Sequence, residues 1–261
     1  MLGVLGFHAG DWLTGGYLGV DLFFVLSGFL ITSILLAEHR AAGRIDLRAF
    51  WIRRARRLLP AVALLMPAIA LYARFFAAPA DRIRIRWDGI ATLAYVANWR
   101  AIFAHRSYWD LFSAPSPLEH TWSLAIEEQF YVLWPLLVGA VLARGRNAPR
   151  RMLVVSIVLA LASAIAMFVL FNPGATTRAY LGTDTRGAAI LVGAALAAWM
   201  APLDGAPKSL RAVRAIDAMA LVAAAGIGFA WFRLDGRSPF LYRGGFWLTE
   251  IAALEIGRAH V

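Results

Sequence analysis

Long apolar stretches, separated by short connections rich in arginine, follow one another along the whole chain. A helix needs about 20 apolar residues to cross a bilayer, and most of the stretches approach that length. The first is much shorter, so we expect the chain to lack the start of its first helix. The pattern predicts an all-α fold, a polytopic transmembrane helix bundle with about eight apolar segments. These segments are residues 1–9, 16–37, 58–78, 118–143, 152–171, 185–201, 217–232 and 245 onward.

Three connections carry most of the positive charge and determine the predicted topology. Residues 38–57 contain seven arginines, residues 144–151 contain four, and residues 202–216 contain one lysine and two arginines. Basic loops stay on the cytoplasmic side of a membrane, so all three are expected there. An even number of crossings must then separate the first two loops. Segment 88–103, which is short and polar near its end, is therefore expected to be re-entrant or interfacial, with a true span as the alternative.

Composition places the chain among membrane proteins. Its 261 residues are 61% hydrophobic and 16% charged, whereas soluble domains are roughly 45–50% apolar and 25% charged. The net charge of +10 would suit nucleic-acid binding. The arginines, however, lie between apolar spans, where topology already explains them, so no nucleic acid is expected as a partner. The chain has no cysteine, which excludes disulfides, thiolate metal ligands and a cysteine nucleophile, and we expect no metal site.

The segment LEHTWSLAIEEQFYVLWP, residues 118–135, places polar side chains at the head of an apolar run. Charged residues inside a bilayer are costly and usually serve function. His120, Ser123 and Glu127 are spaced i, i+3 and i+7, which puts them on one face of a helix. Glu128 adjoins that face. We interpret this polar face as part of an active site at the membrane edge.

His8 and Asp21 lie in the first two apolar segments, which a short turn connects. Both are therefore expected near the outer end of one helical hairpin. A carboxylate beside an imidazole favours its protonated form and holds one tautomer, which suits a general base that accepts a proton from a hydroxyl. The alternative is that both residues bond only backbone or water at the membrane boundary. Ser27 and Gly28, which follow, are interpreted as a kink or a close-packing point.

The sequence WIRRARRLLP, residues 51–60, holds more positive charge than topology requires. Arg54 and Arg57 are three residues apart and Arg53 adjoins them, so guanidinium groups gather on neighbouring helical turns. Paired guanidinium forks match the geometry of phosphate. Plain anchoring at the cytoplasmic surface, or contact with anionic lipid, explains the cluster equally well.

Polar residues also mark two helix starts. Ser116 and Glu119 match a capping box at the start of the helix expected over 118–143. Thr183 or Asp184 is expected to cap the apolar helix that follows residue 184. Capping explains Asp184 fully. It does not explain Arg186, which would lie inside the helix near the outer membrane face and needs a partner.

The predicted topology brings these polar residues to one side of the membrane. We expect Glu127 or Glu128 to pair with Arg186 or with His8, because an unpaired charge there would be too costly. Gly193, in the helix of Arg186, is expected to let a neighbouring helix approach closely.

Taken together, the chain resembles the acyltransferase family 3 proteins, bacterial inner-membrane O-acyltransferases of the O-antigen acetylase type. The matching pieces occur in the family's order over residues 1 to about 200. They are His8 at the end of the first helix, GVDLFFVLSGFLIT (19–32), FWIRRARRLLP (50–60), HTWSLAIEEQFYVLWP (120–135) and TDTRGAAILVG (183–193). The family's upstream basic residue and later helices are missing. We therefore expect one transmembrane acyltransferase domain, residues 1–254, incomplete at both ends, and a non-native tail, residues 255–261.

The resemblance also implies roles for the polar residues. The matching positions are His8 as the catalytic histidine, Arg54 and Arg57 as arginines that handle acyl-CoA, and Glu127 or Glu128, Asp184 and Arg186 as polar positions of the family core. With the interpretations above, the expected catalytic set is His8, Asp21, Glu127 and Glu128. The expected donor-binding set is Arg53, Arg54 and Arg57, and the expected substrate or oxyanion set is His120, Ser123, Asp184 and Arg186.

The expected activity is transfer of an acyl group, acetyl first of all, from acetyl-CoA or another acyl-CoA to a glycan hydroxyl outside the cytoplasm. The acceptor would be lipopolysaccharide O-antigen, exopolysaccharide or peptidoglycan, and the enzyme would be multi-pass in the bacterial inner membrane, in contact with lipid. The alternative is a transporter or flippase that uses the buried charges as a proton or anion path. Consumption of acyl-CoA distinguishes the two.

Overall fold

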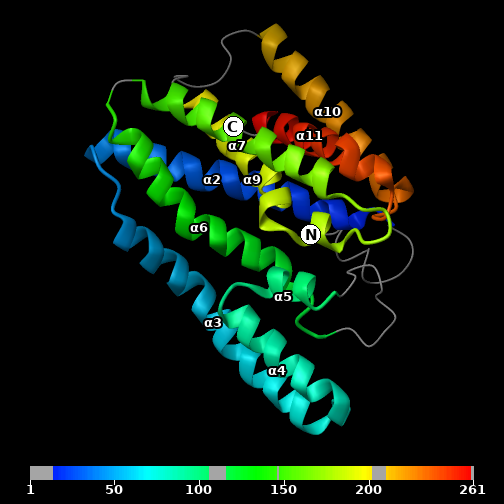
Figure 1. The fold of residues 1–261 in the computed structure, drawn as a ribbon. Helices are drawn as coiled ribbons and strands as arrows, with labels where there is room; N and C mark the ends of the chain where they lie inside the picture. The colour runs from blue at the N-terminus through cyan, green and yellow to red at the C-terminus, as the bar shows by residue number, and fades with distance from the viewer. Residues whose placement is uncertain (1–13, 106–115, 146, 202–209, 260–261) are drawn as a thin grey trace.

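The computed structural model describes residues 14–105, 116–145, 147–201 and 210–259, and Figure 1 shows their arrangement. Within these ranges every regular element is helical. The longer helices are α2 (Gly19–Ala42), α3 (Leu47–Phe75), α4 (Pro79–Leu93), α6 (Thr121–Leu142), α7 (Ala148–Leu170), α9 (Thr183–Met200), α10 (Leu210–Arg233) and α11 (Phe246–Ala259). The shorter ones are η1 (Gly16–Leu18), α5 (Ala97–Phe103), α8 (Thr177–Leu181) and η2 (Leu241–Gly245). The predicted all-α fold is confirmed.

The predicted apolar segments correspond to the long helices. Among the described residues, four helices are long and apolar enough to cross a membrane, namely α2 with its preceding turn, α3, α6 and α7. The 22 residues of α6 extend about 33 Å, which matches a hydrocarbon core about 30 Å thick. The later apolar segments form α9, α10 and α11. Segment 1–9 lies outside the described residues, and α11 continues without a break through residues 255–259.

The helix ends beside the first two basic connections lie at one end of the bundle. A buried apolar cluster at that end joins Phe50 of α3, Leu142 of α6 and Met152 of α7. Arg40, near the end of α2, donates a hydrogen bond to the carbonyl oxygen of Ala201, directly after α9. The helix ends at the first two basic connections and the end of α9 therefore meet, in agreement with the topology predicted from charge.

Segment 88–103 is divided between α4 and α5. The helix is interrupted at residues 94–96, where Tyr95 has a φ of 54°, in the left-handed region. With 15 and 7 residues, neither helix is long enough to cross the hydrocarbon core alone. The structure thus agrees with the expectation that this segment forms no continuous span, and its position relative to the membrane stays a prediction. In Figure 1, α4 returns beside α3, and the pair projects from the other helices.

Helices α2 and α9 cross with their backbones in direct contact. A Cβ atom at Gly28 would overlap the carbonyl oxygen of Ile190, and one at Gly193 would overlap the carbonyl oxygen of Val25. Only glycine permits this approach at the two positions. The close packing expected at Gly28 and Gly193 is confirmed.

The predicted helix starts are wrong in detail. The segment around Ser116 forms a turn, in which the Ser116 hydroxyl accepts a hydrogen bond from the backbone N–H of Leu118, and α6 begins only at Thr121. Helix α9 begins at Thr183 after Gly182, which has no side chain with which to cap it. Thr183 and Asp184, which were expected to cap α9, bind Gln129 and Arg178 instead.

We predict that Gly193→Ala destabilises the fold by about 1–3 kcal/mol, because the added methyl group must push α2 away from α9. The measurement is denaturant unfolding of the chain in mixed micelles. Gly139→Ala in α6 is the matched control, since nothing lies within 4 Å of a Cβ atom there. Equal stability of the two variants would contradict the direct backbone contact.

Candidate active site

A buried ion pair joins the first turns of α2 and α9. Arg186, the fourth residue of α9, places Nη2 2.7 Å from Oδ1 of Asp21, the third residue of α2. Both side chains are fully buried. Because this contact and the glycine crossing follow each other in the same direction along both helices, α2 and α9 run parallel.

Aromatic rings enclose the guanidinium group of Arg186. Its Cζ atom lies 4.4 Å from the ring centre of Phe246, 5.1 Å from that of Tyr180 and 5.9 Å from that of Phe24. The rings attract the cation through their negative faces. They also keep water away, so the charge of Arg186 depends on the carboxylate of Asp21.

The prediction that Arg186 pairs with Glu127 or Glu128 is wrong. The structure pairs it with Asp21, and neither Glu127 nor Glu128 forms an ion pair with it in the described part of the chain. Asp184 is also separate, since its carboxylate accepts two hydrogen bonds from Arg178, at 2.8 and 2.5 Å, near the surface. The sequence pattern placed these residues at the correct end of the bundle but could not show which charges face each other across helices.

Glu127 belongs to a second polar cluster, between α2, α3 and α6. Its carboxylate hydrogen-bonds with the Ser27 hydroxyl, which also contacts the hydroxyl of Tyr131. The positive charges of Arg54 and Arg57 act on the same carboxylate. Thus the α3 arginines and the α6 glutamate, expected at separate sites, are brought together.

Glu128 lies beside this cluster and is almost completely buried. The charges that act on it are those of Glu127 and Arg54. Its Oε1 atom has no hydrogen-bond partner in the described part of the chain. The adjacent carboxylates therefore concentrate negative charge opposite the positive charge of α3.

Arg54 is held in place by aromatic rings. Its Cζ atom lies 5.0 Å from the ring centre of Tyr131 and 5.7 Å from that of Phe50. A guanidinium group stacked on a ring keeps its N–H donors in the ring-parallel plane, where they can bind an oxyanion. Among the other expected donor-binding arginines, Arg53 forms a 3.5 Å ion pair with Glu38, and Arg57 is exposed.

His120 and Ser123 lie at the start of α6. His120 is the N-cap residue, and the Ser123 hydroxyl donates a hydrogen bond to the His120 carbonyl oxygen at 3.5 Å. Partial withdrawal from water lowers the pKa of His120 below its ordinary value. The neutral imidazole is therefore favoured at pH 7, a form that can accept a proton. His8, the expected catalytic base, lies outside the described residues.

A polar network fixes α6 beside α5 and α9. Gln129 donates hydrogen bonds to the Tyr95 carbonyl oxygen at 2.7 Å and to Asn98 Oδ1 at 3.1 Å. The Thr183 hydroxyl donates to Gln129 Oε1 at 2.6 Å, and Asn98 donates to Thr183 Oγ1 at 2.9 Å. This is where Thr183 uses its hydroxyl instead of capping α9. Each side chain in the network has a hydrogen-bond partner within it, so the network serves to position α5, α6 and α9.

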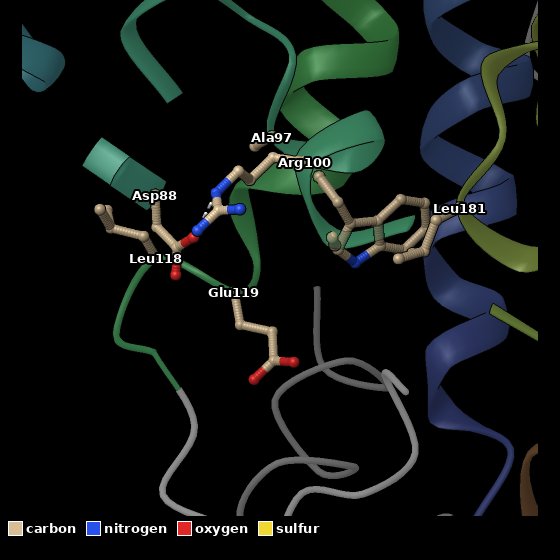
Figure 2. A pocket seen from close by; sticks show the side chains of 8 residues that line it. Asp88, Ala97, Arg100, Leu118, Glu119 and Leu181 are labelled. Atoms are coloured by element: carbon tan, nitrogen blue, oxygen red, sulfur yellow. Dashed lines mark ion pairs between the residues drawn. The ribbon is translucent and has the colours of Figure 1, made fainter. Parts of the chain in front are cut away.

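A small hollow lies beyond the start of α6. Figure 2 shows Asp88 and Arg100 facing each other across it, 3.5 Å apart, with Glu119 nearby. The hollow has a volume of only about 10 Å³. Trp122 closes its inner side but is itself buried against Tyr180 and Phe24. The hollow is therefore a small, mostly apolar space where α4, α5 and the start of α6 meet, with Asp88, Arg100 and Glu119 among its lining residues.

Sequence reasoning missed Tyr131 and Glu250. Tyr131 lies in an apolar run, and nothing in the run distinguishes a tyrosine that supports an arginine from one that fills the core. Glu250 gave a usable signal, because an acidic residue inside an apolar helix is a candidate functional residue. The segment from residue 245 onward was interpreted only as apolar.

The sequence matches one protein family and several curated proteins. A family described as an acyltransferase domain matches residues 1–258. The peptidoglycan O-acetyltransferase OatA of Listeria monocytogenes is 42% identical over 96% of this chain and 40% of its own length. The O-acetyltransferase OatA of Staphylococcus aureus is 38% identical over 98% of the chain and 42% of its own length. The chain thus spans about 40% of these curated relatives. No solved structure matches it.

We predict that Arg186→Gln lowers the free energy of unfolding by about 3–5 kcal/mol, because it leaves the Asp21 carboxylate buried without a partner. Arg178→Gln is the matched control, since it removes a similar ion pair that is partly exposed and should cost about 1 kcal/mol. Adding Asp21→Asn to Arg186→Gln should recover part of the loss. Similar unfolding midpoints for the two arginine variants would contradict the burial of the Asp21–Arg186 pair.

Proposed function

The chain belongs to the acyltransferase family that matches it over residues 1–258, and we propose that it is a membrane-embedded O-acetyltransferase acting on a cell-wall glycan. The donor is acetyl-CoA, and the acceptor is a hydroxyl of peptidoglycan outside the cytoplasm of a bacterium. The names of the relatives support the acceptor class. The single observation that carries the proposal is the position of Arg54 over the Tyr131 ring, 5.0 Å from its centre, where α3 meets α6.

Arg54 and Arg57 bind the phosphate groups of the donor in this proposal. In this proposal the basic end of the bundle faces the cytoplasm, where acetyl-CoA is present, with Arg54 half-buried against α6 and Arg57 exposed beside it. Stacking on Tyr131 fixes the plane of the Arg54 guanidinium while leaving its N–H groups available. The positive charges of Arg54 and Arg57 also act on the Glu127 carboxyl, so that donor phosphates and Glu127 lie in the field of the same arginines. Arg53, which binds Glu38, shapes the rim of this site.

The chemistry is exchange of a thioester for an ester. The glycan hydroxyl oxygen attacks the acetyl carbonyl carbon, the carbon–sulfur bond breaks, and coenzyme A leaves as its thiolate. His8 takes the proton of the hydroxyl and returns it to the thiolate, so atoms and charge balance. His120 and Ser123 are candidates to stabilise the oxyanion or hold the acceptor. Asp21 and Arg186 act as the support of this region, since each already binds the other.

The activity is tested with the full chain in lipid nanodiscs, supplied with acetyl-CoA and soluble peptidoglycan fragments. We expect acetyl ester on the fragments together with an equal amount of free coenzyme A. Release of coenzyme A without ester would indicate an acceptor of another class. Transport of the fragments or of an anion across a vesicle, with acetyl-CoA unchanged, would support a transporter instead.

In the same assay, Arg54→Ala should raise the KM for acetyl-CoA roughly tenfold or more while changing the KM for the glycan little. A charge-assisted hydrogen bond to phosphate contributes about 1.5–3 kcal/mol. Arg54→Lys should recover only part of this affinity, because an ammonium group has neither a planar fork nor a face for Tyr131.

Arg56→Ala is the control, since it removes the same charge from the same cluster at an exposed position. An equal rise in KM for Arg54→Ala and Arg56→Ala would indicate that the cluster acts only through its total charge. Full recovery by Arg54→Lys would likewise favour simple anchoring over phosphate binding.

A further inference from the structure

Glu250 is a buried acidic residue in a helix that is otherwise largely apolar. It is the fifth residue of α11, and only 1% of it is exposed. Its Oε2 atom has no hydrogen-bond partner in the described part of the chain. An ionised carboxylate in such a position would cost several kcal/mol. The surroundings of Glu250 therefore determine whether its carboxyl group carries a proton.

Glu250 lies one helical turn after Phe246 on α11, and the ring centre of Phe246 is 4.4 Å from the Arg186 Cζ atom, so Glu250 faces the ion pair of α2 and α9. The charges that act on its carboxyl are those of Asp21 and Arg186. The hydroxyl-bearing rings of Tyr17, in η1, and Tyr180, in α8, lie around the same pair. Tyr242 and Asp235, whose charges act on Tyr17, are the other titratable groups of the described chain near this cluster.

The cluster has two carboxyl groups and one guanidinium group. Arg186 is committed to Asp21, with 2.7 Å between their atoms, so its charge is already neutralised. If Glu250 were also ionised, the buried cluster would carry a net negative charge among aromatic rings. Two carboxyl groups that share one buried site do not both ionise readily, and one of them keeps its proton.

We propose that Glu250 is a proton-binding positioning residue, which as a neutral acid leaves Arg186 to Asp21 and on losing its proton competes for Arg186. The two carboxyl groups thus share one guanidinium group and one proton. Removing either carboxylate leaves the other to pair with Arg186, and removing the proton from Glu250 draws Arg186 from α2 toward α11. This site lies outside the donor-binding cluster of Arg54 and Glu127.

Infrared difference spectroscopy on the full chain in nanodiscs at neutral pH tests the protonation state. Protonated carboxyl groups absorb at a carbonyl frequency distinct from carboxylates. Glu250→Gln should remove one such band, whereas Glu38→Gln, which changes the partly exposed carboxylate bound to Arg53, should remove none. A spectrum of Glu250→Gln that retains every protonated-carboxyl band would overturn the proposal.

Asp21→Asn tests whether Glu250 shares Arg186. With Asp21 neutral, Glu250 should ionise to pair with Arg186, so its protonated-carboxyl band should disappear although Glu250 is unchanged. A carboxyl group that is merely buried would keep its proton in this variant. Persistence of the Glu250 band in Asp21→Asn would therefore overturn the sharing of Arg186.

The unfolding midpoint gives an independent readout. Asp21→Asn and Glu250→Gln each leave one carboxyl group for Arg186, whereas the double variant leaves none. The double variant should therefore lose more thermal stability than the sum of the two single losses. Additive losses would contradict the sharing. Neither measurement requires acyl transfer, so a negative result in the acetylation assay leaves both tests valid.

In that assay, which rests on the proposed function, alkaline pH should reduce kcat of the wild type as Glu250 loses its proton. Glu250→Gln cannot lose that proton and should keep its kcat to higher pH. If kcat of the wild type and of Glu250→Gln fell over the same alkaline pH range, a positioning effect of Glu250 on the reaction would be contradicted.

Discussion

The pairing of Asp21 with Arg186 is the constraint on which the other contacts of the bundle depend. Both groups are fully buried, and aromatic rings surround the guanidinium group, so neither charge is hydrated. The pair fixes the first turns of α2 and α9 against each other. One helical turn or two further along, Gly28 and Gly193 let the same helices touch through their backbones. Electrostatics sets the register there, and small residues permit the contact.

Helix α2 transmits this arrangement to the donor-binding cluster. On its α6-facing side the Thr32 hydroxyl accepts a hydrogen bond from the Trp134 indole at 2.9 Å, and Ser27 contacts Tyr131. The Tyr131 carbonyl oxygen accepts a hydrogen bond from the Trp51 indole of α3 at 3.0 Å. The α3 arginines are thereby brought beside the α6 glutamates. A continuous set of packed, hydrogen-bonded groups joins the ion pair to Arg54.

Much of this fold could be predicted from sequence, because apolar length and the placement of arginine are properties of single segments. The helices, the shared end of the basic connections and the close packing at Gly28 and Gly193 belong to this class. The partner of Arg186 does not, since Glu127 and Glu128 satisfied the argument from charge, and only tertiary packing selects Asp21. The starts of α6 and α9 were misjudged because their polar residues bind a turn, Gln129 and Arg178 instead of their own helices. The role of His8 stays a prediction.

The central claim is that the donor binds where α3 meets α6. Its most direct test is an electron cryomicroscopy structure of the full chain in nanodiscs with a non-hydrolysable thioether analogue of acetyl-CoA. We predict phosphate density within hydrogen-bond distance of the Arg54 guanidinium, which stays stacked on Tyr131, and the Asp21–Arg186 pair intact. Phosphate density on another face of the protein, with Arg54 unchanged and without a ligand, would contradict the claim.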